Sequence, residues 1–162
     1  MTDTHDATIP AIRHHVTVPV PPGRAFDLFT GRMGDWWPRE HQIGTSPKAG
    51  IAVEPRLGGE VRELGEDGSE CLTGRILVWE PPSRVVISWQ ITARWAPEPD
   101  PSRASDYEVV FTDLGDGTTR VDVEHRHLKR HGPEDGRSIA AAVDADQGWP
   151  HVLAGFRSLA AS

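Results

Sequence analysis

Hydrophobic side chains recur with a helical period near the C-terminal end of the chain. The positions are Trp149, Val152, Leu153, Phe156, Leu159 and Ala160. This spacing of three and four residues places them on one face of a helix. The same pattern extends back to Ser138 and is interrupted by Pro150. Because proline removes one backbone hydrogen bond and clashes with the preceding turn, we expect either a kink near Asp146 or a helix that starts afresh at Trp149.

The middle of the chain has the period of two that is typical of β-strands. Between Val53 and Leu128, hydrophobic and polar residues alternate in short segments separated by glycine and proline turns. We predict strands over 51–55, 60–64, 71–80, 84–92, 105–113 and 119–127, and an earlier strand over 12–20. Gly115, Asp116 and Gly117 supply the turn of an antiparallel hairpin between the last two strands.

Two short helical segments, rather than another strand, follow the first strand. Residues 24–30 have helical spacing after Pro22, which suits the first turn of a helix. Residues 35–38 form a second helical turn or a tight loop, and the polar segment 40–50 reads as a loop. The order of elements predicts an α+β domain in which one long C-terminal helix covers an antiparallel sheet. Gly155 would let that helix approach the sheet closely.

Length and charge limit the functions that fit. A chain of 162 residues can bury one core, and we predict a single domain over 11–162 after a loose N-terminal tail over 1–10. The net charge of −7, without any run rich in Lys and Arg, argues against nucleic acid and anionic membranes as partners. Cys71 is the single cysteine, and no apolar stretch approaches about 20 residues, so we expect a cytoplasmic protein with an inert thiol.

Several short motifs share their order with one known family. They are 16–22 running into 25–30, Trp36-Trp37-Pro38, Gly58-Gly59-Glu60, 79–89, 115–121 and Gly148-Trp149-Pro150. Over nearly the whole chain, this series resembles the AHSA1-like branch of the START/Bet v 1 (SRPBCC) superfamily. The resemblance implies a helix-grip fold, with a curved antiparallel sheet of about 6–7 strands, two short N-terminal helices and one long C-terminal helix.

The resemblance also implies an apolar tunnel between the sheet and the last helix. The superfamily binds lipids, sterols, polyketides and other apolar molecules there, and some members catalyse cyclisation or hydrolysis. The chaperone activator that gives the branch its name depends on a separate N-terminal domain, for which this chain has no room. We therefore do not expect a chaperone partner.

Residues on the inward side of their elements are candidates for the cavity wall. They are Trp37, Trp89, Tyr107, Phe111, His125, His127, Trp149, Val152 and Phe156. Ordinary core packing would produce the same pattern, so both interpretations stay open. Residues 36–38 either plug the core or form the rim of a pocket entrance.

His125 and His127 are two residues apart on a predicted strand, so both should point toward the helix. They could be hydrogen-bonded core histidines, contacts for a ligand oxygen, or metal ligands. A metal needs further ligands, and the other available residues, His131, His151 and Cys71, have no recognised spacing. We therefore predict no metal ligand and no cofactor.

Charged residues bracket the Gly58-Gly59 turn. They are Glu54, Arg56, Glu60, Arg62 and Glu63, for which we expect cross-strand ion pairs on a solvated face. The alternative is a buried Glu–Arg pair that anchors a substrate at the tunnel mouth. No carboxylate is marked by its spacing as close to a second one, as a general acid and base pair would require. Cys71 stands in no order of Cys, His and Asn that is typical of a thiol hydrolase. We therefore assign no catalytic residue.

The function that the sequence favours is the binding of a small apolar or amphipathic molecule between the C-terminal helix and the sheet. One alternative is a cyclase or hydrolase that uses the same cavity, with a histidine as acid or base. Another is a chaperone-interaction module of the Hsp90 type. A homodimer is compatible with each of these hypotheses.

Overall fold

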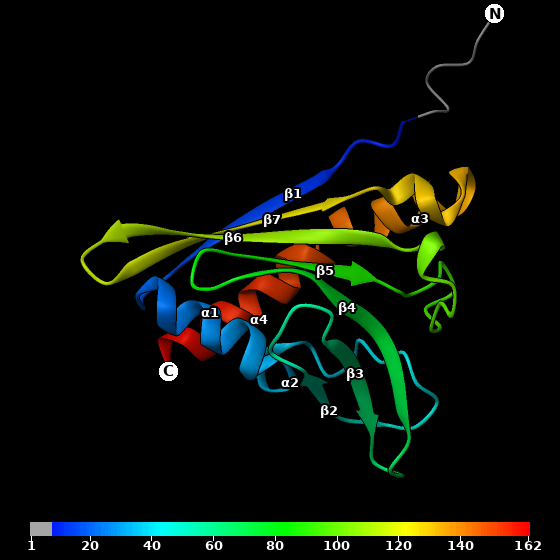
Figure 1. Ribbon diagram of the computed structural model, residues 1–162, viewed down its shortest axis with the longest axis horizontal. Coiled ribbons are helices and arrows are strands. Elements are labelled where there is room, and N and C mark those ends of the chain that lie inside the picture. Colours follow the sequence, from blue (N-terminus) through cyan, green and yellow to red (C-terminus); the bar gives the residue numbers. More distant parts are fainter. Residues whose placement is uncertain (1–7) are drawn as a thin grey trace, which may run out of the picture.

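Within residues 8–162, the chain forms seven strands and four α-helices (Figure 1). The computed structural model describes residues 8–162, so most of the predicted tail over 1–10 lies outside the described residues. The strands are β1 (Ile12–Val18), β2 (Lys48–Val53), β3 (Glu60–Gly65), β4 (Glu70–Glu80), β5 (Arg84–Trp89), β6 (Ser105–Gly115) and β7 (Thr118–Arg126). The helices are α1 (Pro22–Gly31), α2 (Met33–Trp36), α3 (Pro133–Asp144) and α4 (Trp149–Ala161), with short 3-10 turns η2 (Pro101–Arg103) and η3 (Leu128–His131).

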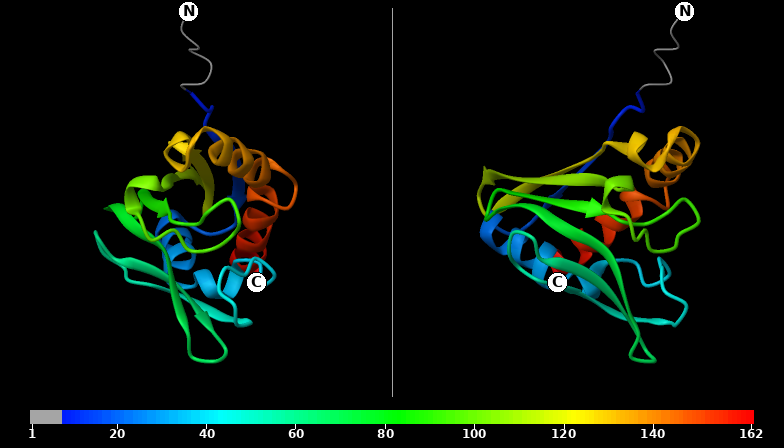
Figure 2. Two further views of the ribbon diagram at one scale, coloured as in Figure 1. Left: turned by 90° about the vertical axis from the view of Figure 1, so that its right-hand side faces the viewer. Right: turned by 45° about the vertical axis from the view of Figure 1, so that its right-hand side comes forward.

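The strands form one antiparallel sheet in the order β1-β7-β6-β5-β4-β3-β2. Consecutive strands β1 and β2 thus lie at opposite edges, and the chain crosses between them through α1 and α2. Figure 2 shows the sheet curling around the helices. The pairing of β4 with its neighbours shifts register between Ile76 and Val78 and opposite Val61 and Arg62. Such irregularities bend a strand, which explains the curvature.

The expected single C-terminal helix is in fact two helices. α3 ends at Asp144 and α4 begins at Trp149, with Pro150 in its first turn. Proline fits there because the first amides of a helix have no partner inside the helix. Of the two alternatives predicted for Pro150, the fresh start at Trp149 is therefore confirmed and the kink near Asp146 is not.

Gly155 brings α4 against another helix rather than against the sheet. A Cβ atom at this position would lie 2.4 Å from the backbone oxygen of Trp36 in α2. Trp36 itself is buried, and its indole nitrogen donates to the backbone oxygen of Leu28 in α1 at 3.0 Å. A close approach at Gly155 thus exists, but its partner is α2 and not the predicted sheet, and it holds the three helices together.

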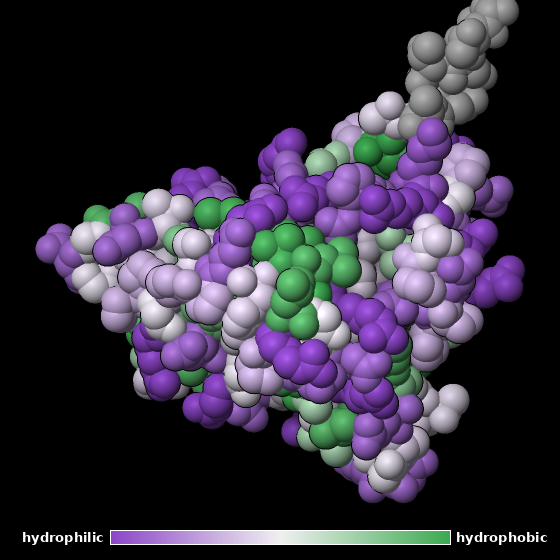
Figure 3. All heavy atoms as spheres, viewed as in Figure 1, coloured by the Kyte–Doolittle hydropathy of each residue, from purple (hydrophilic) through white to green (hydrophobic). Residues whose placement is uncertain are grey.

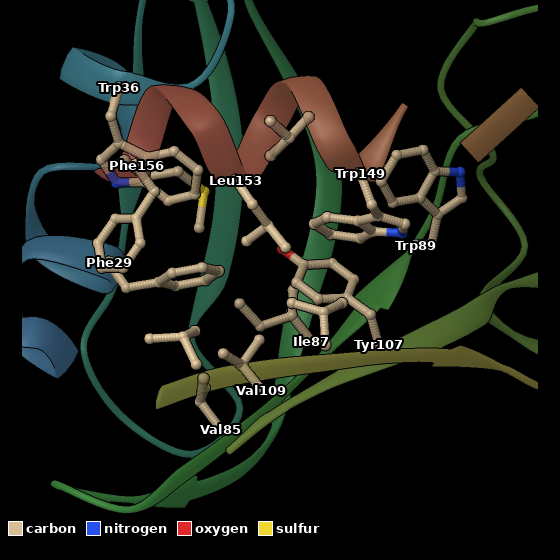
Figure 4. Packing of buried hydrophobic residues seen from close by; sticks show 14 of the residues in the cluster. Phe29, Trp36, Val85, Ile87, Trp89, Tyr107, Val109, Trp149, Leu153 and Phe156 are labelled. Atoms are coloured by element: carbon tan, nitrogen blue, oxygen red, sulfur yellow. The ribbon is translucent and has the colours of Figure 1, made fainter. Parts of the chain in front are cut away.

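The core between the sheet and these helices is solid at one end. Phe29 of α1 packs against Trp36, Phe111 and Phe156, with ring centroids 4.7, 5.8 and 5.2 Å away. Figure 4 shows Phe29, Trp36 and Phe156 of this group apart from a second group around Trp149. Aromatic rings at these separations fill space at the density of a protein interior.

The outer face of the sheet is solvated, as the alternating pattern predicts. Hydrophilic side chains predominate on the face in Figure 3, with one hydrophobic patch near its middle. Ion pairs cross the strands here, including Arg84 to Glu108 at 2.6 Å and Arg13 to Glu124 at 2.6 Å. Within residues 8–162, no helix has both the length and the hydrophobicity that crossing a bilayer requires.

Candidate functional site

A cavity of about 480 Å³ lies at the N-terminal end of α4 and is lined by residues of strands β2 to β6. It is partly open to solvent. Four parts of the chain form its wall. The helices contribute Met33, Ala142, Val143, Trp149 and Val152, and the segment before β2 contributes Trp37, Glu40, His41, Gln42 and Ile43. The sheet contributes Ile51, Val61, Glu63, Thr73, Ile87, Ser88, Trp89 and Tyr107, and loops contribute Ile91, Trp95, Gln147 and Gly148. The volume falls within the range of small-molecule pockets.

Aromatic rings form much of this wall. The rings of Tyr107 and Trp149 lie 4.9 Å apart, and Trp89 lies 6.1 Å from Trp149. The ring of Trp37 lies 5.7 Å from that of Trp149, in an edge-to-face arrangement. Figure 4 shows Trp89, Tyr107 and Trp149 side by side between the helix and the sheet. Flat apolar surfaces of this kind offer a large contact area to a flat apolar ligand.

Two polar groups in the aromatic wall have no partner among the described residues. The hydroxyl of Tyr107 makes no hydrogen bond there, and Nε1 of Trp89 is buried without an acceptor. Burial raises the pKa of Tyr107 far above its ordinary value. The Tyr107 hydroxyl therefore stays protonated at neutral pH and is available as a donor.

His125 does not line the cavity but lies immediately behind it. Its Nδ1 accepts from Nε1 of Trp149 at 3.2 Å, and its Nε2 lies 2.8 Å from Oγ of Ser105. The same Oγ lies 2.7 Å from Nε2 of His131. Desolvation, with a further effect of His131, lowers the pKa of His125 to about 3. This matches a hydrogen-bonded core histidine, one of the three roles that the sequence left open.

His127 lies outside the core, so the prediction that it points toward the helix is wrong. β7 ends at Arg126, and His127 adopts a left-handed backbone conformation with φ of 60°. Its Nδ1 lies 2.5 Å from Oδ1 of Asp106, and about half of its side chain is exposed. The strand alternation that placed His125 and His127 on one face ends one residue too early.

Phe111 and Phe156 point inward but do not line the cavity. Both belong to the solid aromatic end of the core, around Phe29. Of the nine candidate wall residues, five line the cavity: Trp37, Trp89, Tyr107, Trp149 and Val152. Trp36 plugs the core while Trp37 lines the cavity, so both interpretations of residues 36–38 apply, each to one tryptophan.

Sequence reasoning missed the acidic side of the cavity. Glu63 in β3 is 5% exposed and accepts from the backbone amides of Ile43 and Gly44 at 2.9 and 2.7 Å. Its carboxylate is thus bound by backbone groups and not by an arginine. The other predicted charges do form surface pairs, such as Arg56 with Glu54 at 3.2 Å and Arg62 with Glu60.

The segment predicted as a plain loop over 40–50 is held in place by a buried cation. Lys48, the first residue of β2, is 4% exposed, and its Nζ donates to the backbone oxygens of Pro38 and His41 at 2.7 and 3.2 Å. Desolvation lowers the pKa of Lys48, which the nearby Glu63 and Glu40 oppose. The sequence did contain a sign that this segment packs against the core, because Ile43 is a large hydrophobic residue within 40–50.

Three side chains at the rim of the cavity could hold a metal ion. They are Glu40, His41 and His151, whose potential ligand atoms all lie within 4.8 Å of one another. Nε2 of His151 lies 2.8 Å from Oε2 of Glu40, and the rings of His41 and His151 are 5.7 Å apart. Among the described residues, His125, His127 and Cys71 take no part in this group.

Comparison with solved structures identifies similar proteins. An anthrahydroquino-gamma-pyrone synthase, Txn09, is 39% identical, with a TM-score of 0.66 over 94% of this chain and 97% of that chain. The self-sacrificing resistance protein CalC from Micromonospora echinospora is 30% identical, with a TM-score of 0.66 over 93% of this chain and 94% of that chain. A protein from Nitrosomonas europaea, 14% identical with a TM-score of 0.62 over 93% of each chain, shares the fold.

A search of curated proteins finds no match. The sequence profile of one family matches residues 19–161, which is most of the chain. The profile covers α1 and α2, strands β2 to β7, α3 and α4, and thus every element that lines the cavity; β1 lies before the match. The chain therefore belongs to the family of activator of Hsp90 ATPase homolog 1-like proteins.

Proposed function

We propose that this protein binds a small, flat, largely apolar molecule in the cavity at the N-terminal end of α4. The observation that carries the proposal is a cavity of about 480 Å³ walled by the rings of Trp37, Trp89, Tyr107 and Trp149. A core of this size normally packs without such a space, as the Phe29 end of the same domain does. The cavity at the other end therefore supports a role in ligand binding.

The polar groups of the wall suggest what the ligand carries. Tyr107 offers a hydroxyl donor, and Thr73 and Ser88 line the sheet side. Glu63 brings a negative charge, which disfavours an acidic ligand such as a fatty acid. We infer a neutral aromatic molecule with hydroxyl or carbonyl oxygens. The 39% identity to Txn09, whose name refers to an anthrahydroquino-gamma-pyrone, supports a ligand with fused aromatic rings.

A fluorescence titration tests this proposal. The probe is 1,8-dihydroxyanthraquinone, with dodecanoate as an acidic, non-aromatic comparison. Because several tryptophans line the cavity, we expect saturable quenching of tryptophan fluorescence by the anthraquinone and little effect of dodecanoate. Ile51→Trp adds a large side chain to the cavity wall and should weaken the affinity for the anthraquinone at least tenfold.

The matched control is Leu57→Trp, which adds the same ring at a position that is 64% exposed and outside the cavity. This variant should bind like the unmodified protein. Unsaturable quenching, or equal affinity in both variants, would contradict binding in the cavity. Circular dichroism checks that both variants are folded.

A second candidate is a ring-forming enzyme that uses the same cavity. It is favoured by the 39% identity to a pyrone synthase and by the presence of Glu63, His41 and Tyr107 in the wall. A suitable probe is 1-(2-hydroxyphenyl)butane-1,3-dione, which closes to 2-methylchromone. The phenol oxygen adds to the distant ketone carbon and gives up its proton. The former carbonyl oxygen then leaves as water, and the methylene group between the two carbonyls loses a proton as the ring double bond forms.

In this reaction a base accepts the phenol proton and an acid protonates the departing oxygen. His41 can serve as the base because burial lowers its pKa, so its ring is neutral at pH 7. We expect chromone formation above the buffer rate and a loss of at least tenfold in His41→Ala. Binding of the diketone without chromone formation would favour the binding protein over the enzyme.

A further inference from the structure

Two histidines and a carboxylate from separate parts of the chain meet at the rim of the cavity. Glu40 and His41 precede β2, and His151 is the third residue of α4. Their potential ligand atoms lie within 4.8 Å of one another, and Glu40 already contacts His151 at 2.8 Å. Imidazole nitrogen and carboxylate oxygen together suit Zn²⁺ and neighbouring divalent transition metals.

Both elements that carry these side chains are fixed. On one side, the buried Lys48 holds the backbone oxygens of Pro38 and His41, and the amide of His41 donates to Pro38 at 3.1 Å. On the other side, Trp149 anchors the first turn of α4 to His125. A metal site needs ligands that stay in place before the ion arrives, and this scaffold supplies them.

The protonation states at neutral pH suit a cation. Burial lowers the pKa of His41, so its ring is neutral and has a free lone pair. Hydrogen bonds from the backbone and from His151 lower the pKa of Glu40, so its carboxylate is charged. Lys48 and the amino end of α4 place positive charge nearby, which weakens the site, whereas Glu63 and Glu40 offset it.

We propose that Glu40, His41 and His151 form a binding site for a divalent transition metal, with Zn²⁺ as the reference ion. Three protein ligands leave a fourth position, as in zinc sites that act on a bound molecule. Glu40 and His41 also line the cavity, so an oxygen of a cavity ligand can reach that position. The site adds a function to the cavity and does not depend on the aromatic ligand proposed above.

The competing explanation is that Glu40 and His151 form only a surface ion pair that joins the loop to α4. The domain contains a matched pair of this kind, His14 with Asp144, also at 2.8 Å. No second histidine completes that pair within residues 8–162. His14→Ala therefore removes an equivalent His–carboxylate pair without touching the proposed site.

Titration of untagged, chelator-treated protein with Co²⁺ and Zn²⁺ tests the proposal. We expect one ion per chain, a Co²⁺ absorption band in the visible range, and a higher Tm with Zn²⁺. His41→Ala and His151→Ala should each weaken Zn²⁺ binding more than tenfold, whereas His14→Ala should bind as the unmodified protein does. Circular dichroism confirms that the three variants are folded.

Absence of stoichiometric binding to the unmodified protein would overturn the proposal, and so would unchanged affinity in either His41→Ala or His151→Ala. Equal losses in His14→Ala would show that the metal binds elsewhere and would overturn it too. The anthraquinone titration is done in the presence of chelator. A failed metal site and a failed aromatic ligand are therefore separate results.

Discussion

The indole nitrogen of Trp149 donates a hydrogen bond of 3.2 Å to Nδ1 of His125, and both side chains are fully buried. Because indole can only donate, Nδ1 must accept, and the neutral ring carries its proton on Nε2. That proton points to Oγ of Ser105 at 2.8 Å, which leaves the Ser105 hydroxyl to donate to His131 at 2.7 Å. This directed chain joins the first residue of α4 to β7, β6 and η3.

Replacing Trp149 with Phe should destabilise the protein beyond the loss of ring area. The variant keeps an aromatic side chain but leaves Nδ1 of His125 buried without a donor, which costs about 1–3 kcal/mol. Urea unfolding at pH 7 measures the change. Trp37→Phe is the control, since Trp37 lines the same cavity and its indole nitrogen donates to none of the described residues. Equal losses in the two variants would show that the Trp149–His125 bond contributes nothing.

Burial of His125 makes the folded protein less stable as the pH falls. The pKa of His125 falls from 6.5 to about 3 on folding, mainly through desolvation. The unfolded chain therefore takes up the proton first, so the stabilisation is complete above pH 6.5 and is lost as pH falls toward 3. The slope that this one group adds in the window is about 1.4 kcal/mol per pH unit. His131 and His41 act in the same direction, because burial also lowers each pKa.

His125→Gln isolates this effect. Its amide can accept from Trp149 and donate to Ser105, but it does not titrate. We expect a lower free energy of unfolding at pH 7 and a shallower decline between pH 6.5 and 4 than in the unmodified protein. Urea unfolding at several pH values gives both slopes. Parallel curves would contradict the assignment of the slope to His125.

Glu63→Gln should loosen the segment before β2. The carboxylate now accepts from the amides of Ile43 and Gly44 through separate oxygens, whereas glutamine offers only one oxygen. Loss of a hydrogen bond to a charged acceptor costs about 1.5–3 kcal/mol, and the partial burial of these two amides places the expected loss at the lower end. Glu60→Gln in the same strand is the control and should cost less, because Glu60 pairs with Arg62 and Arg75 at the surface. Hydrogen exchange of the Gly44 amide should also speed up in Glu63→Gln alone.

The sheet could be predicted from the sequence because each strand shows its pattern within a few consecutive residues. Alternation of hydrophobic and polar residues placed each strand within a few residues of its observed bounds, as for 105–113 against β6. The break before α4 was also readable, since Pro150 can only lie in the first turn of a helix or distort it. These features depend on neighbours along the chain.

The site was harder to predict because its members meet through tertiary structure. Glu63 sits among surface glutamates in the sequence, and only the fold brings the amides of Ile43 and Gly44 to it. His127 follows the strand pattern, but its own left-handed backbone conformation turns its side chain out of the core. The division of the core into a solid and a hollow end likewise depends on how Phe29 and Trp36 pack, which no periodicity encodes.

A methyl group on Gly155 should separate α4 from α2. The new Cβ would lie 2.4 Å from the backbone oxygen of Trp36, a distance that backbone atoms cannot tolerate, so one helix must move. Overpacking of this kind costs about 1–3 kcal/mol, despite the better helix propensity of alanine. Thermal unfolding measures the loss. Gly23→Ala in the first turn of α1 is the control, because its Cβ would meet nothing within 4 Å. If Gly155→Ala were as stable as Gly23→Ala, α4 and α2 would not be in the close contact described.

Ligand binding should respond differently from stability in Gly155→Ala. The Trp149 end of α4 is held separately by the hydrogen bond to His125, so anthraquinone binding should survive in this variant while Tm falls.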